Sequence, residues 1–263
     1  MARDSARRAG AAPRRLVLAD GTYDAIKAMI LDHEISPGEH VGIDELSRDL
    51  AVSQTPVREA LARLEADGLV TKIPLRGYEA TDLLSVQQFD ELFQFRALIE
   101  PWAASEASRR GTRRDIEALE TELERAEHIE LSGSSSTYPE FVEHDTRLHA
   151  LVAHASGNTF VEEAFIRTHC HMHLFRVYKA TLGIEEREPA HEQRREADGE
   201  FVRNMFAEYY QGGKRPLALT EHVEIVAAIA GGAGDSAREL MLHHIESSRQ
   251  RFIPAVEALN AKA

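Results

Sequence analysis

One stretch, residues 43–78, limits the folds open to this chain more than any other part of it. Apolar residues recur at helical spacing from Ile43 to Leu50, and the pattern then stops. A second helix is predicted to begin at Ser53, which favours the N-cap, with Pro56 in its first turn. Gly68 suits the left-handed residue that ends such a helix. The stretch therefore begins with two short helices joined by a tight turn.

Two runs of strand-forming residues follow the second helix. Residues 69–73 and 78–81 are predicted to pair as a hairpin across the turn from Pro74 to Gly77. Two helices and a hairpin in this order form a winged helix-turn-helix, which places its second helix in the DNA major groove. The pattern alone leaves open an amphipathic helical hairpin with no role in nucleic-acid binding.

The order of residues in this stretch resembles the DNA-binding domain of GntR-type bacterial transcription regulators. The matching segments are SQTPVREAL at 53–61 and RLEADGLV at 63–70, followed by Pro74, Arg76 and Gly77. The resemblance implies that a winged domain at residues 19–82 binds a double-stranded operator, a short palindrome read by a homodimer. The residues it assigns to DNA contact are Arg48, Ser53, Gln54, Thr55, Arg58, Arg76 and Gly77.

Position 54 departs from the family pattern, because Gln54 stands where this motif often has arginine. Arginine prefers guanine edges and glutamine prefers adenine, so we expect the operator to differ from the common one. Gln54 and Thr55 are expected at base edges, and Arg58 at phosphate or guanine. Arg76 and Gly77 should lie in the wing, near the minor groove or the backbone.

The charge of the chain argues against a general nucleic-acid binder. The net charge is −13, and residues 1–80 carry 11 Lys and Arg against 13 Asp and Glu. Affinity must then come from a few placed cations and from dimerisation, with strong salt dependence. A single cysteine, Cys170, and the lack of any apolar run near 18 residues predict a protein of the reducing cytoplasm without a membrane span.

The chain is predicted to be mainly α-helical. Residues 1–18 hold five arginines and are expected to form a disordered basic arm that adds phosphate contacts, or a plain flexible terminus. The winged domain should open with a helix from Thr22 to His33, and residues 83–263 should form an all-α bundle. Bundle helices are predicted at 83–110, 112–130, 139–155, 159–182, 217–230 and 234–259, with a highly charged segment of unassigned role at 183–215.

The bundle region contains a carboxylate and several histidines at spacings that allow a metal site. Asp145 and His149 lie four residues apart, on one helical face. His222 opens the penultimate predicted helix, and His243 and His244 lie on the last one. Neutral imidazoles and a carboxylate from three helices suit a divalent transition metal. Because the chain has 13 histidines, the spacing alone fits ordinary surface salt bridges as well.

The same residues resemble the effector domain of the FadR subgroup of GntR regulators, the FCD type. The match consists of Phe95-Arg96 and Glu100, then DTRLH at 145–149, SGN at 156–158, Glu221-His222 and His244. It implies that residues 83–263 bind an effector and dimerise. The implied metal ligands are Asp145, His149, His222 and His244, with zinc as the first candidate and nickel or manganese as alternatives. A small carboxylate effector would then reach that metal.

Three further residues are assigned to effector contact. Arg96 can clamp an effector carboxylate or form a salt bridge with Glu100 one turn later, and the sequence favours neither. In the segment HCHMH at 169–173, His173 and the nearby Arg176 are expected to face the effector. A separate metal site in that segment is an alternative with less support, because His169 and His173 share a face that His171 does not.

These observations predict a ligand-responsive transcription regulator, acting as a repressor, rather than an enzyme. One alternative is a metal-dependent enzyme, but no second pair of groups is spaced as a nucleophile and a base. The other is a regulator whose metal is purely structural. The effector, the metal, the operator sequence and the sign of regulation are not specified by the sequence.

Overall fold

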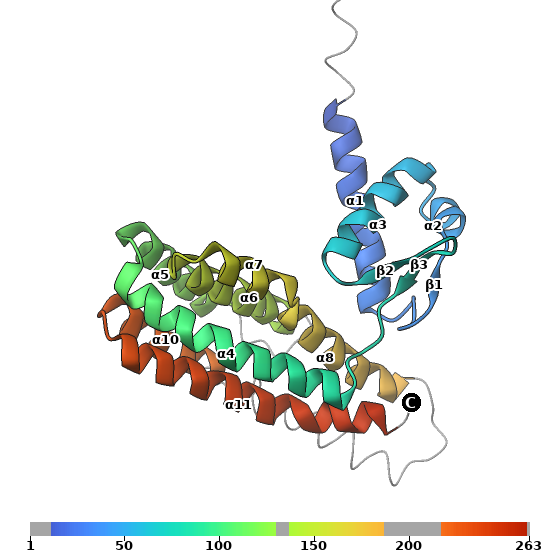
Figure 1. Cartoon of the computed structure of the whole chain (residues 1–263). Helices are drawn as coiled ribbons and strands as arrows, with labels where there is room; N and C mark the ends of the chain where they lie inside the picture. The colour runs from blue at the N-terminus through green and yellow to red at the C-terminus, as the bar shows by residue number, and fades with distance from the viewer. Residues whose placement is uncertain (1–11, 130–136, 187–216, 262–263) are drawn as a thin grey trace, which may run out of the picture. The chain divides into compact units, whose positions relative to one another are not determined.

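A computed structural model of the chain describes residues 12–129, 137–186 and 217–261. The chain divides into two compact units, with the boundary between Leu83 and Leu84. In the described part of the chain, the first unit contains a small sheet and three helices, and the second contains helices but no strand (Figure 1). This confirms the predicted fold class. Among the described residues, no helix is both long and apolar enough to cross a membrane.

The first unit is a winged helix-turn-helix. Its helices are α1 (Ala12–Leu31), α2 (Ile43–Asp49) and α3 (Gln54–Ala66), and its strands are β1 (His40–Val41), β2 (Val70–Ile73) and β3 (Gly77–Ala80). The strands form one antiparallel sheet in the order β1-β3-β2. Gly68 adopts a φ of +72° at the end of α3, as its position predicted, and the chain turns there into β2. The core is built from Ile26, Ile30, Leu46, Val57, Leu61, Leu64 and Leu69, all buried.

Two features of this unit differ from the prediction. Helix α1 begins at Ala12, so residues 12–18 of the predicted disordered arm are helical. Pro13 lies in the first turn, where its missing N–H costs nothing. Residues 1–11 of that arm lie outside the described part of the chain. The strand β1 was not predicted, because two residues show no alternation, and its pairing of Val41 with Tyr78 is long-range.

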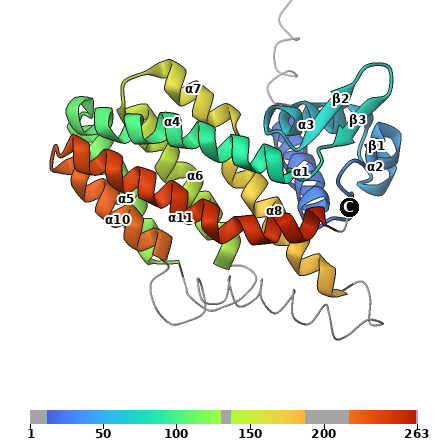
Figure 2. The same cartoon turned by 60° about the horizontal axis from the view of Figure 1, so that its bottom comes forward.

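The second unit is a bundle of helices (Figure 2). Its described helices are α4 (Val86–Arg110), α5 (Arg113–Glu127), α6 (Thr137–Ala155), α7 (Thr159–Arg167), α8 (Cys170–Glu186), α10 (Leu217–Ala230) and α11 (Gly234–Asn260). The longest two, α4 and α11, lie side by side in both views. Capping boxes fix where two of the helices start, with Ser85 and Gln88 at α4 and Thr112 and Asp115 at α5.

The predicted helix at 159–182 is wrong in one respect, because it is two helices. His169 adopts a φ of +44° between α7 and α8, a left-handed conformation that no continuous helix contains. Periodicity could not reveal this break, since neither glycine nor proline marks it. The charged segment predicted at 183–215 begins inside α8, and its residues from 187 onward lie outside the described part of the chain.

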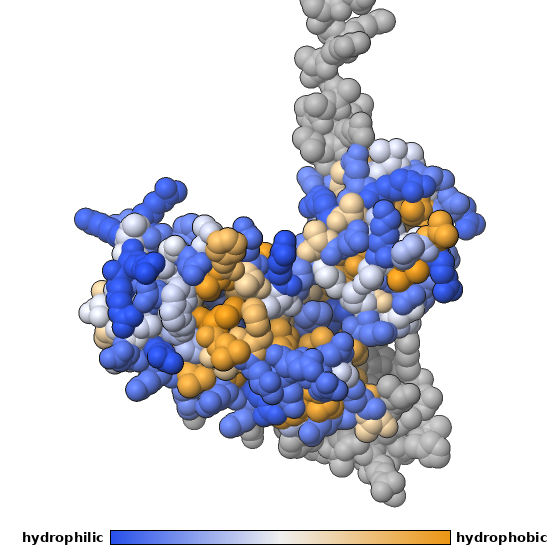
Figure 3. All heavy atoms as spheres, in the orientation of Figure 1, coloured by the Kyte–Doolittle hydropathy of each residue, from blue (hydrophilic) through white to orange (hydrophobic). Residues whose placement is uncertain are grey.

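One side of the bundle carries large apolar side chains that remain exposed. Leu98 and Trp102 lie one turn apart on α4, and Phe160 and Ile166 lie on α7, which packs beside α4. Their exposed fractions are 76%, 37%, 81% and 52%. Figure 3 shows apolar atoms gathered on this part of the surface. Such a patch is typical of a protein–protein interface.

Candidate metal centre

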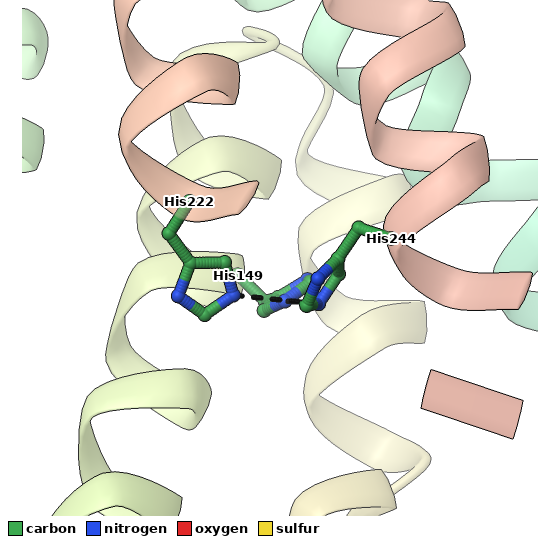
Figure 4. A group of neighbouring side chains, drawn as sticks. All are labelled: His149, His222 and His244. Carbon is green, nitrogen blue, oxygen red and sulfur yellow. Dashed lines mark hydrogen bonds between the residues drawn. The ribbon is translucent and has the colours of Figure 1, made fainter. Parts of the chain in front are cut away.

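Three histidines from three helices meet inside the bundle (Figure 4). His149 comes from α6, His222 from α10 and His244 from α11, and all three are buried. The Nε2 atom of His244 lies 3.2 Å from that of His149 and 3.3 Å from that of His222. The three rings therefore present their Nε2 atoms to one common point.

Asp145 joins this group from one turn before His149. Its Oδ1 atom lies 3.4 Å from Nε2 of His222, and 30% of its side chain is exposed. His243, the neighbour of His244, is exposed instead, because successive residues of a helix point about 100° apart. The structure thus brings three of the four residues that the family resemblance assigned as metal ligands, His149, His222 and His244, into one group. It places the fourth, Asp145, beside one of them, His222.

Buried carboxylates fix the orientation of two of the rings. Glu100 on α4 accepts a hydrogen bond from Nδ1 of His149 at 2.5 Å, and Glu221 on α10 accepts one from Nδ1 of His244 at 2.8 Å. A ring that donates from Nδ1 and is neutral has an unprotonated Nε2, which is the atom a metal binds. Two such nitrogens cannot donate a hydrogen bond to each other, and a cation bound between them would account for their separation of 3.2 Å.

The geometry fits a tetrahedral or octahedral transition metal. Metal–nitrogen bonds of about 2.1 Å, at bond angles between about 90° and 109°, place the two nitrogens roughly 3.0–3.4 Å apart. The separations of 3.2 and 3.3 Å between the Nε2 atoms fall in this range. Three imidazoles and one carboxylate suit zinc, nickel or manganese. The cluster could therefore hold a metal ion.

Burial keeps the rings of His222 and His244 in the form that binds metal. Burial lowers the pKa of His222 well below its ordinary value, and the neighbouring rings of His244 and His149 lower it further. Burial also lowers the pKa of His244, although its hydrogen bond to Glu221 opposes this shift. Metal binding needs the neutral ring, so it does not have to displace a proton from either residue at neutral pH.

Arg96 forms a buried ion pair with Glu100. Its Nε atom lies 2.6 Å from Oε1, and its Nη2 atom 3.3 Å from Oε2. Burial alone would raise the pKa of Glu100, but the charge of Arg96 and the hydrogen bonds from His149 and Arg96 hold it well below its ordinary value. Nη1 of Arg96 has no hydrogen-bond partner among the described residues. The salt bridge that the sequence left open is therefore present, and the Nη1 amino group of Arg96 remains for a ligand.

The segment at 169–173 contributes a residue that the sequence analysis did not select. The ring of His171 lies 5.0 Å from that of His149, and burial lowers its pKa well below the ordinary value. The turn at His169 resets the helical phase, which is why spacing could not identify His171. His173 has its pKa lowered to about 4 by burial and by Arg176, itself buried, and the assignment of both to effector contact stays a prediction.

The described residues hold two overlapping groups that could bind a metal ion, and neither includes residues 169–173. One is the three-histidine cluster, and the other is His144, Asp145 and His222. His144 is buried, and its Nε2 atom lies 3.0 Å from Nδ1 of His222. The sequence offered no signal for His144, because its partners lie 22 and 78 residues away.

The residues expected to contact DNA lie on the exposed side of the winged unit. Gln54, Thr55 and Arg58 are exposed on the first two turns of α3, with Ser53 exposed at its N-cap. Arg48 is exposed at the end of α2. Arg76 is exposed in the turn between β2 and β3, and Gly77, with a φ of +96°, opens β3.

Comparison with known proteins agrees with this description of both units. A family model described as bacterial regulatory proteins of the gntR family matches residues 18–79, and a model of the FCD domain matches residues 91–197. The Nta operon transcriptional regulator of Aminobacter aminovorans is 28% identical over 229 residues, which cover 87% of this chain and 91% of that protein. The Uxu operon transcriptional regulator of Escherichia coli K12 is 27% identical over 249 residues, covering 88% and 86%.

Solved structures show the same fold. The structure of E. coli McbR/YncC matches with a TM-score of 0.57 at 18% identity, covering 88% of this chain and 94% of that one. A GntR transcriptional regulator from Rhodococcus sp. RHA1 matches with a TM-score of 0.57 at 20% identity, covering 91% and 97%.

Proposed function

This chain is a DNA-binding transcription regulator of the GntR family with an FCD effector domain, and we propose that its helical domain binds a divalent metal and a small organic acid. The relatives and structural neighbours are transcription regulators, so the chain is a regulator rather than an enzyme. We assign residues 19–82 to operator binding and residues 83–263 to effector binding and dimerisation.

The single observation that carries the metal proposal is the convergence of three Nε2 atoms in a buried site. His149 and His244 each donate from Nδ1 to a buried carboxylate, so their Nε2 lone pairs face each other at 3.2 Å. Asp145 supplies a fourth donor atom close to His222. We assign Asp145, His149, His222 and His244 as the ligands, with zinc as the first candidate.

The charge balance of the site favours an anionic effector. Each of the three buried glutamates near the cluster has an arginine partner: Arg96 for Glu100, Arg147 for Glu122 and Arg251 for Glu221. Three neutral imidazoles, one aspartate and a divalent ion then carry a net charge of about +1. A bound metal supplies a Lewis-acid position that a carboxylate oxygen can occupy.

Arg96 gives the effector a second contact. Its Nη1 atom is buried and lacks a hydrogen-bond partner among the described residues, while its other nitrogens are held by Glu100. A buried donor without an acceptor is costly, and a carboxylate beside the metal would satisfy it. His171, which packs against His149, would form part of the wall of the same site.

Operator recognition is assigned to the exposed end of α3 and to the wing. The Gln54 side chain donates to Asp44 at 2.5 Å and accepts from Arg58 at 3.2 Å, so the two recognition side chains are aligned on one face. We propose that Gln54 and Thr55 read base edges and that Arg58 contacts phosphate or guanine. Arg48 and Arg76 are exposed and are assigned to the DNA backbone.

A homodimer would present two such winged units to a palindromic operator. The apolar patch of Leu98, Trp102, Phe160 and Ile166 is the surface of the bundle that we propose is buried between subunits. Repression relieved by effector is the simplest mode of action. It requires effector and operator to change each other's affinity by the same factor.

Metal content tests this proposal directly. The untagged protein is expected to hold about one equivalent of a transition metal, and His149→Ala and His244→Ala are expected to lose it. His243→Ala is the matched control, since this neighbour is exposed and should leave the metal in place. Absence of metal from the wild type, even after reconstitution, would refute the ligand assignment. The assignment of DNA binding to the winged unit would stand.

A thermal-shift screen separates effector sensing from a purely structural metal. A ligand at about 100 times its dissociation constant stabilises the native state by about 2.7 kcal/mol. If the site binds acids through the metal, small carboxylates should raise the melting temperature of the metal-loaded protein only. Equal melting temperatures in every acid, with a large loss on chelation, would indicate a structural metal.

A further inference from the structure

Resting on the metal centre proposed above, we propose that His144 and Glu122 are positioning residues that hold His222 in the tautomer able to bind the metal. The three ligand histidines are oriented by partners of two kinds. His149 and His244 contact carboxylates directly, whereas His222 contacts a fourth histidine, His144.

The chain of contacts begins at a buried glutamate on α5. Oε1 of Glu122 lies 3.0 Å from Nδ1 of His144, and Oε2 lies 2.9 Å from Nε of Arg147. Nη1 of Arg125 lies 3.6 Å from the same Oε2. Both carboxylate oxygens therefore face donors, and a carboxylate paired with a guanidinium accepts hydrogen bonds only.

The proton positions along the chain follow from that starting point. Because Glu122 can only accept, Nδ1 of His144 must carry the proton of that hydrogen bond. Nε2 of a neutral His144 is then an acceptor, and it lies 3.0 Å from Nδ1 of His222, which must donate. The proton of His222 is thus on Nδ1, and its Nε2 lone pair faces Nε2 of His244 and Oδ1 of Asp145.

Burial limits the protons of His144 and His222 to this one arrangement. Glu122, His144 and His222 are all buried, so bulk water does not offer either ring a replacement partner. Without an acceptor at His144, His222 would be free to carry its proton on Nε2, where a metal would have to displace it. A histidine ligand whose outer partner is removed typically loses metal affinity by about 10–100-fold.

Metal affinity measured by competition with a chelator tests the inference in four variants of the full chain. His144→Phe keeps a ring but removes the acceptor, and we expect metal to bind about 10–100-fold more weakly. His144→Gln returns an amide oxygen near the position of Nε2 and should restore most of that affinity. Glu122→Gln keeps the shape but allows an amide to donate to His144, which would reverse both tautomers, so we expect about tenfold weaker binding.

Glu143→Gln is the matched control. Glu143 precedes His144 on α6, is 72% exposed, and pairs with the same Arg147 at 3.3 Å. Removing this surface charge should change metal affinity by less than about twofold. The melting temperature of each metal-free variant measures any purely structural cost. If His144→Phe lowers that temperature but binds metal like the wild type, the positioning role is refuted.

A second readout does not depend on metal. Long-range proton–nitrogen correlation of 15N-labelled histidine reports which ring nitrogen is protonated. The metal-free wild type should show His222 protonated at Nδ1, and His144→Phe should lose this preference. A wild type that binds no metal but shows this tautomer refutes the metal centre and leaves the positioning role standing. A wild type that shows His222 protonated at Nε2 refutes the positioning role, whether or not metal binds.

Discussion

Replacing Glu100 with glutamine should damage two properties of the helical domain at once. Glu100 is buried, pairs with Arg96 through both oxygens, and accepts the Nδ1–H of His149. Glutamine keeps the size of the side chain but removes its charge. The substitution therefore leaves the buried guanidinium of Arg96 without a counter-ion and weakens the partner that orients His149.

The magnitude follows from these contacts. Breaking a buried ion pair by removing one partner costs about 3–5 kcal/mol, because the remaining charge stays buried. For a domain of this size, each kcal/mol lowers the melting temperature by about 2–4 °C, so Glu100→Gln should lower it by roughly 6–20 °C. Loss of the partner of His149 should weaken metal binding by about 10–100-fold.

Two further variants make the assay discriminating. Glu106→Gln on the same helix removes a glutamate that pairs with Arg109 and Arg110, both more than half exposed, and should cost less than about 1 kcal/mol. The double variant Arg96→Met with Glu100→Gln removes both charges, so it should regain much of the metal-free stability but not the metal affinity. Melting temperature without metal and chelator competition with metal measure the two effects separately.

The reasoning would be refuted if Glu100→Gln and Glu106→Gln gave the same melting temperature and the same metal affinity. A fall in melting temperature with unchanged metal affinity would refute only the role of Glu100 in orienting His149.

Three other substitutions test separate parts of the structure. His173→Gln should reduce the loss of stability at acidic pH. Burial and Arg176 lower the pKa of His173 to about 4 in the folded protein, so between pH 6.5 and 4 the unfolded chain binds a proton at this residue and the folded chain does not. This term costs the wild type about 2 kcal/mol at pH 5, and equal melting-temperature losses from pH 7 to pH 5 in both proteins would contradict it. Gly111→Ala should destabilise the bundle by about 1–3 kcal/mol, because the new Cβ would lie 2.5 Å from the carbonyl oxygen of Ala107. Gly21→Ala is the control, since nothing lies within 4 Å of a Cβ added there. Gln54→Arg should shift the preferred base at one operator position from adenine toward guanine, changing the difference in binding free energy between the two bases by about 1–3 kcal/mol. If the wild type and the variant select the same sites from a random duplex pool, the assignment of Gln54 is disproved.

The sequence alone was sufficient to predict those elements that are determined by residues close together in the chain. The start of α3 near Ser53 follows from the capping preference of serine, and the left-handed conformation of Gly68 follows from the backbone freedom of glycine. The β2–β3 hairpin follows from alternation within a few residues. Those local signals, in their order, also identified the DNA-binding unit. Strand β1 was missed because it depends on pairing with a distant strand. The break at His169 was missed because it depends on a left-handed conformation that a histidine in the sequence does not indicate.

The metal centre was also only partly predictable from local signals. Asp145 and His149 lie one helical turn apart, so their shared face could be predicted from spacing. The positions of His222, His243 and His244 made them candidates, but the assignment of His222 and His244 as ligands came from resemblance to a family. Only the tertiary structure could show that Glu100, Glu221, His144 and Glu122 surround these ligands, because it brings together residues up to 95 positions apart. Periodicity reports which face of a helix is buried, but the partner that a buried polar atom meets is decided by how helices pack.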